Sequence, residues 1–94
     1  MTDPLKVEIL HKPEEKFRVT QIEKVLQNAA RAANIKIVII RTSDFPAFSN
    51  YNFNPAKTPI VFINRAIEFV SGVPVLNVVK KKLVEVRDRD SWLF

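Results

Sequence analysis

The stretch that decides the fold is residues 58–70, TPIVFINRAIEFV, in the second half of the chain. Residues 60–63 are all apolar and mostly β-branched, which favours a buried strand. Asn64 and Arg65 then provide a two-residue turn, and residues 66–70 return as a second strand. The stretch therefore predicts an antiparallel β-hairpin.

The first half of the chain predicts a strand followed by a long helix. Residues 5–10, LKVEIL, alternate apolar and charged side chains, which is typical of a strand with one face better buried than the other. The helix begins near residue 14, after Pro13, or near residue 21, and Asn34 ends it. Its apolar repeat consists of Phe17, Ile22, Val25, Leu26, Ala29, Ala30 and Ala33.

Residues 35–40, IKIVII, form the most hydrophobic stretch, and their near-continuous apolar character predicts a central strand covered on both faces. Strand, helix and strand together make a βαβ unit with parallel strands. We therefore expect an α/β fold with a mixed sheet of about four strands and with helices on both of its faces.

An aromatic segment, residues 42–57, connects the two halves. It is rich in turn-forming residues, so we expect a short helix or an ordered loop that packs its aromatic rings against the sheet. A platform for stacking bases or a ligand is the alternative function of these rings. The rings belong to Phe45, Phe48, Tyr51 and Phe53.

The chain ends in a second helix and a short tail. Pro74 is expected to start this helix, and residues 87–94 are expected to follow it as a tail. Burial of the apolar side chains of Trp92 and Phe94 lowers the free energy. We therefore expect the tail either to fold back or to dock on another chain. With residues 1–4 as an N-terminal tail, the 94 residues make one domain.

Composition excludes several classes of function. The chain has no cysteine, which rules out disulfides, thiol redox centres and Cys-ligated metal sites. One histidine and one glycine argue against a multi-His metal site and a Gly-rich phosphate loop, so we expect no cofactor. No apolar run is long enough to span a membrane, and we expect a cytoplasmic protein.

The order of these elements resembles that of small thioredoxin-like and glutaredoxin-like proteins. The resemblance covers nearly the whole chain and is most specific where Thr58-Pro59 precedes the hairpin and Gly72 and Pro74 precede the last helix. In that family the proline is cis and faces the active site. The resemblance therefore implies a cis Pro59 and a Thr58 backbone that pairs with an extended substrate.

The chain departs from this family at the redox motif. Lys12, Pro13 and Glu15 stand where relatives carry Cys-x-x-Cys, and neither a lysine nor a carboxylate forms a mixed disulfide. Arg65 stands where relatives usually place a glycine, so this turn either accepts strain or adopts another geometry. The resemblance thus implies the fold, whereas the missing cysteines exclude the thiol–disulfide exchange of the family.

The resemblance, together with the absence of cysteine, therefore implies a redox-inactive thioredoxin-like domain that binds protein as an adaptor or assembly subunit. An unidentified protein is the expected partner, and a second copy of the chain is left open. We do not expect an enzyme, because Lys12 and Glu15 read as a solvated salt bridge and His11 as a hydrogen-bonded histidine. The expected partner-binding residues are Lys12, Pro13, Glu15, Thr58, Pro59, Trp92 and Phe94.

The alternative is a small nucleic-acid-binding protein. The net charge of +5 favours acidic partners, and basic residues cluster near residues 12–18 and 80–89. If the two clusters share a face, they could neutralise several phosphates, although the chain has no nucleic-acid recognition motif. The second cluster consists of Lys80, Lys81, Lys82, Arg87 and Arg89.

Overall fold

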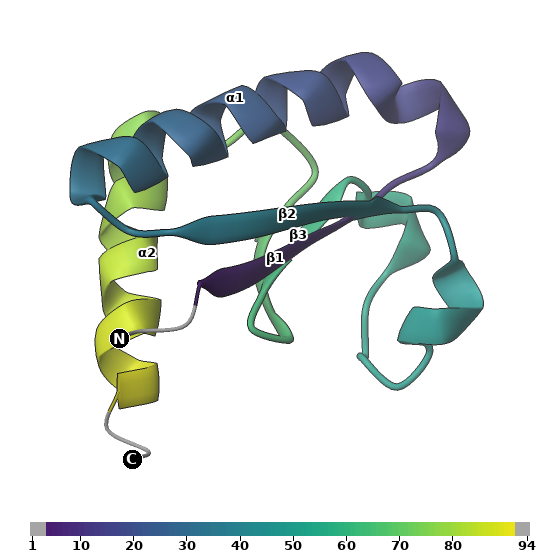
Figure 1. Ribbon diagram of the computed structural model, residues 1–94. Helices are drawn as coiled ribbons and strands as arrows, with labels where there is room; N and C mark the ends of the chain where they lie inside the picture. Colours follow the sequence, from purple (N-terminus) through teal and green to yellow (C-terminus); the bar gives the residue numbers. More distant parts are fainter. Residues whose placement is uncertain (1–3, 92–94) are drawn as a thin grey trace.

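The computed structural model describes residues 4–91 as a four-stranded mixed sheet with two α-helices (Figure 1). The spatial order of the strands is β2-β1-β3-β4, with β1 and β2 parallel and β3 antiparallel to both of its neighbours. This confirms the α/β class and the mixed sheet. The strands are β1 (Leu5–Leu10), β2 (Ile37–Thr42), β3 (Ile60–Ile63) and β4 (Ala66–Val70). The helices are α1 (Lys16–Ala33) and α2 (Leu76–Ser91), with short 3₁₀ turns η1 (Pro13–Glu15), η2 (Phe45–Phe48) and η3 (Pro55–Lys57).

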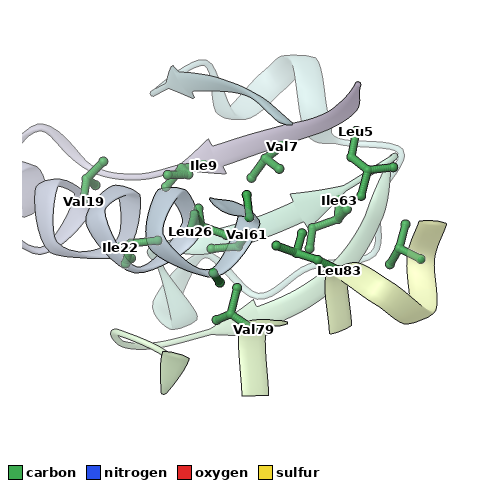
Figure 2. Packing of buried hydrophobic residues seen from close by; sticks show 13 residues of the cluster. Leu5, Val7, Ile9, Val19, Ile22, Leu26, Val61, Ile63, Val79 and Leu83 are labelled. Atoms are coloured by element: carbon green, nitrogen blue, oxygen red, sulfur yellow. The ribbon is translucent and has the colours of Figure 1, made fainter. Parts of the chain in front are cut away.

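One face of the sheet packs against both helices and forms the larger core (Figure 2). Val7 and Ile9 of β1 lie beside Ile63 and Val61 of β3 and point to the same face. The apolar stripe of α1 covers them, because residues three and four apart share one side of a helix. The stripe and the facing side of α2 consist of Val19, Ile22, Leu26, Ala29, Ala30, Val79, Leu83 and Val86.

The aromatic segment covers part of the opposite face. Phe62 of β3 is fully buried there, with its ring centroid 5.0 Å from that of Phe48 and 5.2 Å from that of Tyr51. The half-buried Phe45 and Phe53 pack against the same cluster. The segment is ordered into the turns η2 and η3, as predicted, and its aromatic rings form a second, smaller core.

Two predictions about the sheet are wrong. The stretch expected as a central strand, residues 35–40, contributes to β2, which lies at the edge of the sheet, because β1 pairs with both β2 and β3. Within residues 4–91, helices do not cover both faces either, since α1 and α2 share the one core. As a consequence, Val38 and Ile40 of β2 remain 49% and 40% exposed on the face without helices.

The ends of the helices differ in part from the prediction. The first helix starts at the earlier of the two expected positions, as η1 continued by α1, and Asn34 ends it in the left-handed conformation with φ 55°. Phe17 does not belong to the buried stripe, because its side chain is 78% exposed. The stripe runs through Val19 and Ile22, and Phe17 is five residues before Ile22 and therefore off its line.

The second helix begins and ends later than expected. It starts at Leu76 rather than at Pro74, and it continues to Ser91. Residues 87–91 are therefore helical and not part of a tail, which corrects that boundary. Trp92 and Phe94, two of the expected partner-binding residues, lie outside the described residues.

The hairpin turn between β3 and β4 accepts the left-handed conformation without a glycine. Asn64 has φ 49° and Arg65 has φ 71°. The turn is attached to β1, because the Lys6 backbone N–H donates to Asn64 Oδ1 at 2.9 Å and the Asn64 N–H donates to the Lys6 carbonyl at 2.8 Å. The sequence left two outcomes open for Arg65, strain or another turn geometry. The turn shows the first, with positive φ at a residue other than glycine.

Candidate partner-binding site

The candidate site lies where the chain leaves β1 and where it enters β3. Leu10 pairs with Ile60 in the antiparallel ladder, so the end of β1 lies beside the start of β3. The residues after Leu10 and those before Ile60 therefore meet at one end of the sheet. This brings η1 next to Thr58 and Pro59, although they are more than forty residues apart in the sequence.

The carboxylate of Glu15 joins these two segments. The hydroxyl of Thr58 donates to Glu15 Oε2 at 3.2 Å, and the backbone N–H of Lys12 donates to Glu15 Oε1 at 2.7 Å. The Glu15 backbone N–H in turn donates to the Lys12 carbonyl at 3.0 Å. Hydrogen bonds to an ionised acceptor are among the stronger ones in proteins. Glu15 thus fixes the loop of residues 12–15 to the entry of β3.

Thr58 and Pro59 are the buried residues that directly precede β3 at this end of the sheet. Both residues are buried, with Thr58 5% exposed, and the peptide bond between them is cis. The N–H of Ser71 donates to the carbonyls of Lys57 and Pro59, at 2.8 and 3.1 Å. The hydroxyl of Thr58 also lies 3.3 Å from the carbonyl of Pro55, the first residue of η3.

His11 is a structural residue of this corner. Its backbone N–H donates to the Thr42 carbonyl at 3.0 Å, and its ring Nδ1 lies 2.8 Å from the Lys12 carbonyl. Because a carbonyl only accepts, Nδ1 carries the proton in this bond. The residue is 7% exposed, so His11 is the hydrogen-bonded histidine that the sequence indicated.

The exposed side chains near η1 are of several kinds: apolar, acidic and aromatic. Pro13 and Glu14 are exposed on η1, and the half-buried Lys12 precedes them. Phe17 stands at the start of α1 with most of its ring in solvent. Sequence reasoning assigned Phe17 to the core and missed it here; its position off the apolar stripe was the available signal. Aromatic side chains, phenylalanine included, are enriched in protein–protein interfaces.

The basic residues of α2 divide into two groups. Lys82 and Arg89 both approach the carboxylate of Glu68 on β4, at 3.6 and 3.7 Å, and Arg87 lies 3.2 Å from Asp88. These three cations therefore already have acidic partners. Lys80 and Lys81 are exposed, beside a shallow open depression that two carboxylates also line. The residues lining this depression are Asn77, Lys80, Lys81, Val84, Glu85 and Asp88.

The two basic clusters do not form one continuous surface. The start of α1, with Lys12, Lys16 and Arg18, lies at one end of the molecule, whereas α2 crosses the opposite end of α1 (Figure 1). A phosphate backbone would have to cross the length of α1 to touch both. The structure thus brings Lys12, Pro13, Glu15, Thr58 and Pro59 together and leaves the basic cluster of α2 apart.

Comparisons with protein families, with curated proteins and with solved structures find no match for this chain. Within residues 4–91, no group of three acidic or histidine side chains is arranged to hold a metal ion. In the same part of the chain, neither helix has the length and apolar character needed to cross a bilayer. The candidate site therefore has to be judged by its own geometry.

Proposed function

We propose that this protein is a redox-inactive thioredoxin-like domain that binds another protein as an adaptor or assembly subunit. The observation that carries the proposal is the bridge from Glu15 to Thr58 and Lys12. Where thiol chemistry would need two cysteines, this chain has a carboxylate that fastens the loop to the entry of β3. Such a loop is preorganised, and preorganisation lowers the entropic cost of binding.

The surroundings of the bridge support a protein as the ligand. Thr58, which the family resemblance pairs with an extended chain, is held beside the loop by its hydrogen bond to Glu15. Phe17 adds an exposed aromatic ring, and Pro13 adds an exposed rigid surface. A polar backbone contact flanked by apolar anchors is the usual composition of a peptide site.

Affinity purification of the full chain from its native cell at low salt and at about 1 M salt tests the proposal, because charges are screened beyond ~3 Å at the higher concentration. We expect a discrete protein that stays bound at high salt and whose recovery falls at least tenfold with Phe17→Ala. Val78→Ala is the matched control, since Val78 is another exposed apolar side chain, 53% exposed, on α2. Recovery of nucleic acid alone would contradict the proposal.

Nucleic-acid binding stays as a second candidate because of Lys80 and Lys81, which are exposed beside each other on α2. A salt titration of binding to random-sequence DNA distinguishes it. This function predicts tight binding at low salt that falls steeply with salt concentration, and a flatter salt dependence for Lys80→Ala/Lys81→Ala. Absence of binding at low salt would exclude it.

A further inference from the structure

The two edges of the sheet differ in how they are protected. At β4, the pairing with β3 contains an irregularity at Val61/Phe62, and Lys82 and Arg89 of α2 gather at Glu68. Bulges and charges of this kind keep an edge strand from pairing with another chain. β4 therefore has the usual safeguards of an edge.

β2 lacks such an irregularity, and its one charged side chain, Arg41, is paired with Glu23 of α1. The strand is six residues long, it contains neither proline nor glycine, and its register with β1 is regular throughout. Among the strands that the structure describes, only β1 pairs with it. Val38 and Ile40 are exposed on the face without helices. A long, regular and apolar edge is a template for pairing with another strand.

The ladder between β1 and β2 shows which backbone groups point outward. The carbonyls of Lys36 and Thr42 accept hydrogen bonds from β1 and from the residue after it, each at 3.0 Å. In a parallel ladder, alternate residues bond the same neighbour, so the even-numbered residues of β2 bond β1. The N–H and C=O groups of Ile37, Ile39 and Arg41 therefore point to the open edge.

We propose that β2 pairs with β2 of a second copy of this chain, antiparallel and centred on Ile39, to form one continuous sheet across a twofold axis. In this register Ile39 exchanges both backbone hydrogen bonds with Ile39 of the second copy, and Ile37 does so with Arg41. All three outward residues of each strand are then satisfied. Registers shifted by one pair leave an outward residue of β2 without a partner inside the strand.

The side chains fit the same register. Val38 comes to lie opposite Ile40 of the second copy at a pair without hydrogen bonds, where Cα atoms approach to ~4.5 Å. The twofold axis repeats this contact, so four exposed apolar side chains bury one another. The only charged side chain of β2, Arg41, is paired with Glu23 of its own copy and faces Ile37 of the other. No like charges are opposed, and this self-complementarity favours a second copy over an acidic peptide.

Sedimentation of the full chain over a range of concentrations tests the pairing, and its outcome does not depend on the partner-binding site. We expect a species with twice the 10.8 kDa mass of one chain, and a monomer when Val38→Lys is introduced. Val78→Lys on α2 is the matched control and should leave the mass unchanged. A monomer at every concentration, or a dimer that Val38→Lys leaves intact, would overturn the proposal; so would a monomer that binds foreign extended peptides at β2.

A cross-link fixes the register. Because the chain has no cysteine, Ile39→Cys introduces a unique thiol. Hydrogen-bonded antiparallel pairs have Cα atoms ~5.5 Å apart, which is within the range for a disulfide. We expect mild oxidation to link Ile39→Cys into a covalent dimer, whereas Val70→Cys, on the protected edge β4, stays uncross-linked. Cross-linking of the control alone would contradict the proposed register.

Discussion

The two faces of the sheet are closed by different means. Two long helices cover one face, and their apolar stripes meet the strands in a core of fully buried side chains. A segment of turns covers only part of the other face, and it does so with aromatic rings. The first face is a completed core, while both edge strands keep exposed apolar side chains, Val38 and Ile40 on β2 and Ile67 and Val70 on β4.

The regions that stabilise the fold are therefore different from the regions proposed to bind a partner. Burial in the helix-covered core supplies most of the apolar area that holds the fold together. The candidate site and the proposed pairing edge both lie outside that core. Side chains at the candidate site and at the β2 edge can therefore be changed at small cost to folding. Substitutions on the two faces of the sheet can thus be compared by experiment.

The largest effect is expected on the helix-covered face. Leu26 is fully buried, and Leu26→Ala leaves a cavity between α1 and the sheet. Substitutions of this kind cost about 2–5 kcal/mol. Denaturant unfolding should therefore show a large fall in the midpoint for the whole molecule. A cost below about 1 kcal/mol would show that this face is not a tightly packed core.

On the aromatic face we expect a smaller and more local effect. Tyr51 is half-buried, and its ring meets Phe62 edge-on at 5.2 Å. Tyr51→Ala should cost about 1–2 kcal/mol. Hydrogen exchange should accelerate in residues 45–57 and stay slow in α1. Equal acceleration in both regions would mean that the two faces unfold as one unit.

The bridge at the candidate site should contribute no more to folding than the Tyr51 ring does. Glu15→Ala removes the acceptor of two hydrogen bonds and is expected to cost about 1–2 kcal/mol. Glu14→Ala is the matched control, because Glu14 is exposed in the same turn. The comparison is made by thermal unfolding of both variants. Equal losses would show that the bridge does not fasten the loop to β3.

Much of the fold could be predicted because it depends on local patterns. The alternation in residues 5–10, the apolar stripe of α1 and the hairpin at Asn64-Arg65 are all encoded within a few neighbouring residues. The position of β2 could not be predicted in this way. Its apolar run suits a central strand and an uncovered edge equally well, and only its long-range pairing decides between them.

The candidate site could be predicted only in part, for the same reason. The resemblance indicated Lys12, Glu15 and Thr58 as residues of one region, but the hydrogen bond between Glu15 and Thr58 depends on side-chain geometry that no spacing encodes. Lys82 and Arg89 looked like a basic patch because their acidic partner, Glu68, is distant in sequence. Charge runs in a sequence overestimate the charge that a ligand meets.

The central claim, that a protein partner contacts the loop fastened by Glu15, is tested most directly by photo-cross-linking in the native cell. A photoreactive phenylalanine analogue is introduced at Phe17, an exposed residue two positions after Glu15, and the same analogue at Val78 is the exposed control on α2. We predict discrete protein adducts from position 17 and none from position 78. Adducts with nucleic acid alone, or no adducts from position 17, would contradict the account.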